Sequence, residues 1–250
     1  MNKENLTVLS QEKLTSKIFK MKLKGASVKT MLTPGQFVHL KVGERHPVLR
    51  RPISICSVEE DILTIVYRIE GQGTKLLNQK AAGDTVDTLG PLGKGFPLTE
   101  ESTALLIGGG VGIPPLLYLA EQLYRRGTKV KVILGYRKKE EIFLEEEFQK
   151  YGEVFVTTED GSKGVKGFVT DAIAEAGTYD VFYTCGPKPM LRAVETASPK
   201  KGYISLEERM GCGVGACLAC VCDKQKPFEG KAYVKACRDG PVFEAGEVIV

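Results

Sequence analysis

Residues 106–115 read LIGGGVGIPP, and this stretch decides the fold of the second half of the chain. It joins an apolar run, typical of a buried strand, to a helix expected near residues 113–125. A glycine-rich turn between a strand and a helix places backbone N–H groups where they can bind phosphate. The stretch can also be only a tight turn, because Ile113 stands where the G-x-G-x-x-G pattern requires its last glycine.

From residue 103 to residue 206 predicted strands and helices alternate. The strands are expected at residues 104–107, 129–136, 153–157, 180–185 and 202–206, and the helices near 113–125 and 140–151 and from about 170 and 188. Five strands joined by crossover helices predict an open parallel sheet with helices on both faces. We therefore expect a doubly wound α/β domain over residues 100–206.

The fourth of these strands ends in Cys185 and Gly186, at the carboxyl edge of the predicted sheet. Ligands bind at this edge in such sheets, so Cys185 is a candidate to face a ligand. A lone cysteine at a strand end can equally be a small buried hydrophobic residue.

Residues 1–99 contain short strands separated by Gly, Pro and Asp, among them the alternating stretches 38–42 and 62–67. This pattern predicts an antiparallel β-barrel, which we expect to have six strands. Residues 73–80 break the alternation and predict a short helix. Arg51 and Ser54 offer a guanidinium that can bind phosphate and a neutral hydroxyl, although Arg51 can also be an exposed residue at the barrel rim.

The C-terminal segment, residues 207–250, is dominated by cysteines. Cys212, Cys217, Cys220 and Cys237 follow the order C-x4-C-x2-C…C, by which thiolates bind a two-iron, two-sulfur (2Fe-2S) cluster. Zinc is the alternative, although structural zinc sites usually use paired short loops. Cys222, two residues after Cys220, is a second candidate for the fourth ligand.

Composition and charge argue against nucleic-acid and membrane functions. The net charge of +4 comes from dispersed Lys and Arg residues, which form no basic stripe for nucleic acid. No run of about eighteen apolar residues predicts a membrane span, and the N-terminus has no apolar signal segment. Because its seven cysteines suit metal or redox chemistry in a reducing compartment, we expect a cytoplasmic protein.

Taken in order, the motifs resemble a known family. The barrel with Arg51-Pro52-Ile53-Ser54, the glycine turn and the Cys185-Gly186 strand end are similar to flavoproteins of the ferredoxin reductase type. The cysteine segment, with Cys237 before an Arg-Asp-Gly-Pro stretch, narrows the resemblance to electron-transfer subunits of type B dihydroorotate dehydrogenases. The resemblance covers essentially the whole chain and favours Cys237 over Cys222 as fourth ligand.

This resemblance implies a set of site residues. Those that would hold FAD are Arg51, Pro52, Ile53, Ser54, Val66, Tyr67, Arg68, Gly73 and Thr74. Those that would hold NAD+ are Gly108, Gly109, Gly110, Val111, Gly112 and Gly186, with Cys185 near the nicotinamide as the catalytic candidate. The cluster ligands would be Cys212, Cys217, Cys220 and Cys237. The residues alone do not decide between NAD and NADP, because Arg137 stands where a ribose-binding acid is expected. The resemblance to the family favours NAD.

The resemblance also implies a partner. A catalytic subunit with FMN, two copies of each chain, would oxidise dihydroorotate in pyrimidine biosynthesis and pass electrons through the cluster and FAD of this chain to NAD+. We expect the apolar residues Val214, Ala216, Leu218, Ala219 and Val242 to exclude water at that interface. The alternatives are a subunit of a bifurcating ferredoxin-NADP reductase or a sulfhydrogenase, and a non-catalytic module that only carries the cluster.

Overall fold

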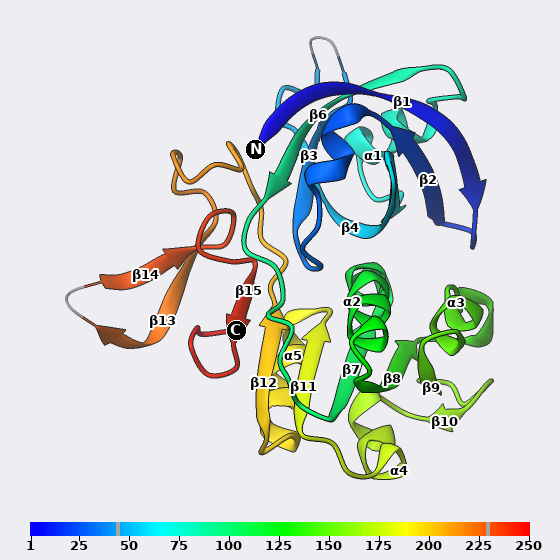
Figure 1. The fold of residues 1–250 in the computed structure, drawn as a ribbon, viewed down its shortest axis with the longest axis vertical. Coiled ribbons are helices and arrows are strands. Elements are labelled where there is room, and N and C mark those ends of the chain that lie inside the picture. The colour runs from blue at the N-terminus through cyan, green and yellow to red at the C-terminus, as the bar shows by residue number, and fades with distance from the viewer. Residues whose placement is uncertain (44–45, 229–230) are drawn as a thin grey trace.

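A computed structural model of the chain describes residues 1–43, 46–228 and 231–250. Figure 1 shows a barrel above an α/β sheet, with the C-terminal segment beside both. None of the helices in the described residues is long and apolar enough to cross a membrane.

Six antiparallel strands close the N-terminal barrel in the order β1-β2-β5-β4-β3-β6, which confirms the predicted architecture. Alternate side chains, such as Leu6, Met21 and Ile65, point inward and are fully buried. The strands are β1 (Asn2–Lys13), β2 (Ile18–Lys24), β3 (Phe37–Lys41), β4 (Arg51–Glu59), β5 (Ile62–Arg68) and β6 (Thr85–Leu92). The predicted short helix is α1 (Gln72–Asn78), and a 3-10 turn, η1 (Ala26–Thr30), precedes β3.

The second half forms a seven-stranded sheet in the order β10-β9-β8-β7-β11-β12-β15. The five predicted strands are all present and parallel: β7 (Thr103–Gly109), β8 (Lys129–Tyr136), β9 (Gly152–Thr158), β11 (Val181–Cys185) and β12 (Lys201–Ser205). Two short strands that the sequence did not indicate extend the sheet, parallel β10 (Val165–Lys166) and antiparallel β15 (Val242–Glu244).

Helices cover both faces of this sheet, as expected for a doubly wound fold. Leu106 and its alternate neighbours pack with α2 (Pro114–Arg125) and α3 (Glu145–Gln149), whereas Leu105 and Ile107 pack with α4 (Ile173–Ala176) and α5 (Lys188–Ala197). Short 3-10 turns are η2 (Gly110–Gly112), η3 (Lys139–Glu141) and η4 (Val169–Ala172). Helix α3 is shorter than predicted, because η3 takes up its start and Leu144 adopts a left-handed conformation with φ 63°.

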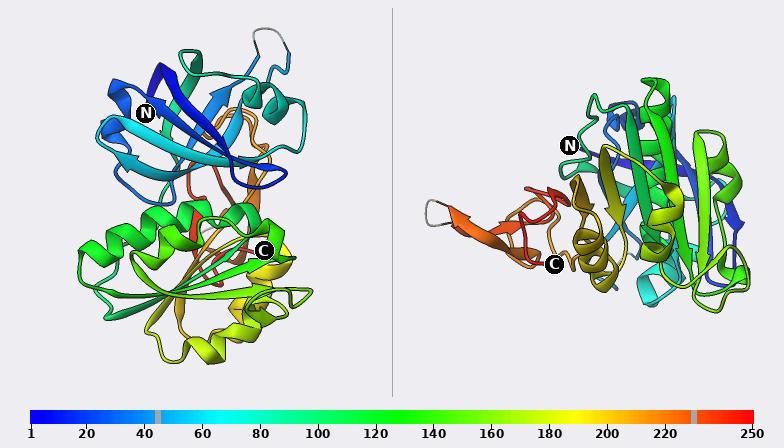
Figure 2. Two further views of the ribbon diagram at one scale, coloured as in Figure 1. Left: turned by 90° about the vertical axis from the view of Figure 1, so that its right-hand side faces the viewer. Right: turned by 90° about the horizontal axis from the view of Figure 1, so that it is seen from below.

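The C-terminal segment is joined to both other parts of the fold. Its hairpin, β13 (Val221–Phe228) and β14 (Lys231–Lys235), projects away from the barrel and the sheet (Figure 2). Its last strand, β15, pairs with β12, and the Leu206 N–H donates to the Pro241 carbonyl at 2.9 Å. The Lys94 N–H, between barrel and sheet, donates to the Gly240 carbonyl. The cysteine loop is therefore held close to both of the larger domains.

Candidate functional site

The glycine turn and the Cys185 strand end meet at the carboxyl edge of the sheet. Gly108 pairs with Cys185 in the β7–β11 register, so the two motifs are neighbours. A Cβ added at Gly112 would lie 2.3 Å from the carbonyl oxygen of Cys185 and 2.6 Å from the Gly186 nitrogen. Gly110, with φ 53°, turns the chain into α2, which opens with Pro114. Glycine at residue 112 thus allows the close backbone contact that holds this edge together.

Cys185 lies at this edge as a buried, neutral thiol. Its side chain is only 8% exposed, and burial raises its pKa to about 12 although a hydrogen bond from Ser205 acts in the opposite direction. A thiol becomes nucleophilic only as the thiolate. Cys185 is therefore suited to contact a ligand through a small, soft surface, and it is not suited to covalent chemistry at neutral pH.

On the barrel, Arg51 lies across the start of α1. A Cβ added at Gly73 would fall 2.1 Å from the Arg51 Nε, so the guanidinium packs directly on this glycine. Thr74 closes the same turn, where its hydroxyl accepts the N–H groups of Glu70 at 3.0 Å and Gly71 at 3.3 Å. A guanidinium over a glycine at a helix start fits a phosphate group.

The remaining predicted FAD residues lie on β4 and β5. Pro52, Ile53 and Ser54 are half-buried on β4 beside Arg51. Tyr67 points into the barrel core, where its hydroxyl donates to Gln11 Oε1 at 2.6 Å. By alternation along β5, Val66 and Arg68 point to the opposite face from Tyr67. Tyr67 can therefore reach a ligand outside the barrel only through its backbone.

Arg68 connects the barrel to the glycine turn. Its Nη2 would be 3.3 Å from a Cβ at Gly110, and its Nη1 lies 3.4 Å from Glu70 Oε1. The predicted FAD residues and the predicted NAD+ residues therefore face each other across a short distance. Sequence spacing did not indicate this contact, because residues 68 and 110 belong to different domains.

Sequence reasoning missed Glu207, which lies two residues after the end of the last parallel strand, β12. Its side chain is solvent-exposed, yet burial raises its pKa, as does Glu70, whereas Arg68 acts to lower it. Glu70 and Arg68 both act on this carboxylate, so Glu207 lies near the barrel residues that follow β5. The available signal was an acid at the carboxyl edge, where ligands bind in such sheets.

Four cysteines share a network of backbone hydrogen bonds to sulfur. The Sγ of Cys212 accepts the N–H groups of Val214 at 3.4 Å and Ala216 at 3.2 Å. Three further bonds link the other sulfurs to the same network: Cys212 N–H to Cys217 Sγ at 3.3 Å, Gly215 N–H to Cys237 Sγ at 3.2 Å and Cys237 N–H to Cys220 Sγ at 3.4 Å. Amide donors of this kind stabilise thiolates, and the donor set fits an iron–sulfur cluster.

The same hydrogen-bond network includes the Cys237 sulfur and does not include the Cys222 sulfur. Burial raises the pKa of both thiols, to about 12 and about 11, so acidity does not distinguish them. The contacts do, because Cys237 exchanges hydrogen bonds with the loop, whereas the Cys222 thiol donates only to the Cys220 carbonyl at 3.8 Å.

The pKa of Cys212 is lowered, whereas those of Cys222 and Cys237 are raised. Burial acts to raise its pKa, but the N–H groups of Val214, Cys217 and Ala216, with the Cys217 thiol, outweigh burial and lower it to about 6. Cys217 is exposed at the surface, whereas Cys220 and Cys237 are buried. One side of the loop therefore faces solvent and the other faces the protein interior.

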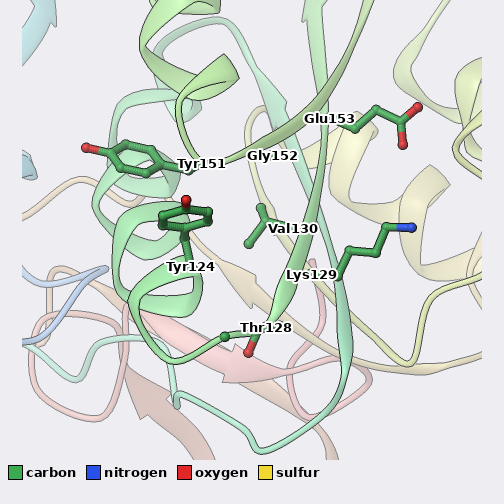
Figure 3. A pocket seen from close by; sticks show the side chains of 8 residues that line it. Tyr124, Thr128, Lys129, Val130, Tyr151, Gly152 and Glu153 are labelled. Atoms are coloured by element: carbon green, nitrogen blue, oxygen red, sulfur yellow. The ribbon is translucent and has the colours of Figure 1, made fainter.

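A surface pocket of about 340 Å³ lies elsewhere, at the amino ends of β8 and β9 (Figure 3). Tyr124 and Tyr151 line it, with ring centroids 5.9 Å apart. It is at the edge of the sheet opposite the glycine turn, and none of the predicted site residues lines it. Ligands of such sheets bind at the carboxyl edge, so we do not assign the cofactors here.

Comparison with known proteins identifies three consecutive regions. Residues 5–96 match an oxidoreductase FAD-binding domain, and residues 106–196 match an oxidoreductase NAD-binding domain. Residues 207–249 match the iron–sulfur cluster binding domain of dihydroorotate dehydrogenase B. Two curated relatives, from Geobacillus sp. (strain WCH70) and Bacillus cereus (strain B4264), are 51% and 52% identical over the full length of both chains.

Both relatives are dihydroorotate dehydrogenase B (NAD(+)) electron transfer subunits. The chain belongs to this family. As an electron transfer subunit it is part of an NAD-dependent oxidoreductase with a catalytic partner, and its domains are those that bind FAD, NAD and an iron–sulfur cluster. The predicted cofactors are confirmed, and the alternative of a passive cluster carrier is wrong.

Solved structures show how widely the fold of this electron transfer subunit is used. An NADH-dependent reduced ferredoxin-NADP oxidoreductase, studied for flavin-based electron bifurcation, has a TM-score of 0.89 and 30% identity over 98% of this chain and 89% of its own. A ferredoxin NADP+ reductase from Neisseria gonorrhoeae has a TM-score of 0.68 at 18% identity, covering 79% of this chain and 90% of its own. The second likeness concerns the fold alone.

Proposed function

We propose that this subunit carries electrons between NAD+ and the FMN of a dihydroorotate-oxidising catalytic subunit, in a cytoplasmic complex with two copies of each chain. The family assignment supports the reaction, and the resemblance of the motifs supports the FMN and the copy number. The seven cysteines form no disulfide in the described residues, which accords with a reducing compartment.

We assign FAD to the face formed by β4, β5 and the start of α1. In this assignment the Arg51 guanidinium and the N–H groups at Gly73 and Thr74 bind its phosphates. NAD+ is assigned to residues 108–112, where the backbone N–H groups of the glycine turn bind its pyrophosphate and Cys185 and Gly186 contact its nicotinamide. When bound, a flavin converts the single electrons of an iron–sulfur cluster into the hydride that a nicotinamide accepts.

One observation carries this proposal: the three sites adjoin. Arg68 of the FAD face lies beside Gly110 of the NAD+ turn, and the cysteine loop contacts the barrel through Gly213, where an added Cβ would meet His39. Electron carriers must lie close together to exchange electrons. The closeness of the FAD face, the NAD+ turn and the cysteine loop therefore favours one shared function over three unrelated ones.

We place the contact with the catalytic subunit on the exposed side of the cysteine loop. Val214 is 42% exposed and Leu218 is 48% exposed, and Ala216 and Ala219 are exposed beside them. Leu218 also has φ 58°, a conformation that is unfavourable for a branched residue. Val242, which the sequence also suggested for this surface, is buried in β15 and packs against the core, so it is excluded.

Leu218→Asp tests this assignment in the reconstituted complex. A charge in the apolar contact should abolish assembly and dihydroorotate-dependent NAD+ reduction, while NADH still bleaches the flavin of the isolated subunit. Phe168→Asp is the matched control, because Phe168 is 64% exposed and precedes η4, far along the chain from the cysteine loop. Unchanged assembly and electron transfer in Leu218→Asp would show that the contact lies elsewhere.

A further inference from the structure

His39 is a buried polar residue without a polar partner. It lies on β3 with no exposed surface, and neither ring nitrogen makes a hydrogen bond. A neutral imidazole has one N–H donor and one acceptor, and buried groups of this kind are normally paired. The unpaired nitrogens of His39 therefore require an explanation.

One side of His39 is tied to the FAD-binding strands. The residue pairs with Pro52 of β4, inside the Arg51–Ser54 motif. Its carbonyl accepts a hydrogen bond from Arg50 Nη1 at 3.1 Å, and its ring packs edge-on against Phe37 with centroids 6.4 Å apart. The position of the imidazole is thus set by the same strands that carry the predicted FAD residues.

The other side of the ring touches the cysteine loop. A Cβ added at Gly213 would lie 2.5 Å from His39 Nδ1 and 3.1 Å from Cε1, so the ring packs directly on this glycine. Gly213 has φ 74° and follows the ligand Cys212. The Cys212 carbonyl is near enough to act on the imidazole, but it does not meet hydrogen-bond geometry. His39 therefore connects the FAD-binding strands directly to Gly213, the residue after the predicted cluster ligand Cys212.

We propose that His39 is a positioning residue for electron transfer, which fixes the cysteine loop against the FAD-binding strands and supplies a ring N–H donor beside Cys212 and Gly213, where the cluster would bind. This inference rests on the proposed function, because it assumes that the four cysteines hold a cluster. A hydrogen-bond donor stabilises the more negative, reduced cluster and raises its reduction potential. Removal of the donor should lower the potential.

The test compares His39→Leu with His39→Gln in the full chain loaded with FAD and cluster. Redox titration followed by electron paramagnetic resonance reports the cluster, and absorbance reports the flavin. We expect His39→Leu to lower the cluster potential and alter its resonance spectrum, with the flavin potential unchanged. His39→Gln, which keeps a donor and an acceptor, should restore most of the native values.

His46→Leu is the matched control, because His46 is exposed and should leave both potentials unchanged. A native cluster potential and spectrum in His39→Leu would overturn the proposal, as would a shift of the flavin potential alone. If His39→Leu fails to retain the cluster, retention by His39→Gln supports the polar contact and loss in both variants overturns it. Bleaching of the wild-type flavin by NADH tests the proposed function independently of His39.

Discussion

The cysteine loop and the parallel sheet are stabilised in opposite ways. Strands β7 and β11 bury nearly every side chain, and their backbone groups pair with neighbouring strands. Residues 207–220, all of which the structure describes, contain no helix or strand, and Val214 and residues 216–219 are exposed. The sheet can therefore fold by burying apolar surface, whereas the loop depends on what its sulfurs bind.

Cysteine itself shows this difference. Cys56, in the core between barrel and sheet, is 1% exposed, and burial raises its pKa to about 12. Cys212 in the loop has a pKa lowered to about 6 by backbone N–H groups that outweigh burial. One residue type thus serves as a small apolar side chain in one region and as a thiolate in the other, according to the number of amide donors around it.

The largest expected effect is loss of the cluster. Cys237→Ser should abolish or alter the electron paramagnetic resonance signal of the reduced cluster, because Cys237 belongs to the sulfur–amide network. The FAD content should stay near that of the wild type, since Arg51 and α1 are in the barrel. Cys222→Ser is the matched control and should keep the native signal. The reverse pattern in these two variants would assign the fourth ligand to Cys222.

A smaller effect is expected from Gly112→Ala, which tests the packing of the sheet edge. The added Cβ would meet the Cys185 carbonyl at 2.3 Å, and backbone cannot move aside easily. We expect the free energy of unfolding to fall by roughly 1–3 kcal/mol and NAD+ affinity to fall with it, while the cluster signal is retained. Urea unfolding and NADH titration measure the two effects.

Gly71→Ala is the control for that variant, because nothing lies within 4 Å of its added Cβ and its φ is −136°. Its free energy of unfolding should stay within about 0.5 kcal/mol of the wild type. Equal losses in the two variants would mean that the close backbone contact at Gly112 has no special importance.

The smallest effect concerns the buried thiol of Cys56. Its pKa is raised in the folded chain, so its contribution to stability is complete below the unfolded value near 9 and is lost as pH rises toward 12. At pH 10 the loss should be about 1.4 kcal/mol. Urea unfolding of the wild type and of Cys56→Ala at pH 8 and pH 10 measures it. A stability difference between the two proteins that does not change with pH would contradict the prediction.

Much of the fold could be predicted because it rests on local patterns. Alternation of apolar residues indicated the barrel strands, and the strand–helix order with the glycine turn indicated the five parallel strands. Strand β15 was missed because three residues after a cis Gly240-Pro241 bond carry little pattern, and they pair only through contact with β12. The late start of α3 was missed for a related reason, since the left-handed Leu144 before it is not a residue type that marks such a turn.

The candidate site also has features that the sequence could predict and features that it could not. Cysteine spacing and the glycine turn indicated the cluster and the dinucleotide, because the chemistry of each ligand limits which residues can bind it. The inward orientation of Tyr67, the position of Glu207 and the contact of Arg68 with Gly110 could not be predicted. The last two depend on how the barrel and the sheet domain pack, and the direction of Tyr67 depends on which face of β5 the closed barrel buries.

By itself, then, the sequence determined which cofactors this subunit can bind and on which segments, because glycine conformations and thiolate spacing are local properties of the chain. Only the tertiary structure decided how those segments face one another. Buried contacts such as His39 on Gly213 join residues that are far apart in the chain, and they form because closure of the barrel and pairing of β15 with β12 bring the cysteine loop against the FAD-binding strands.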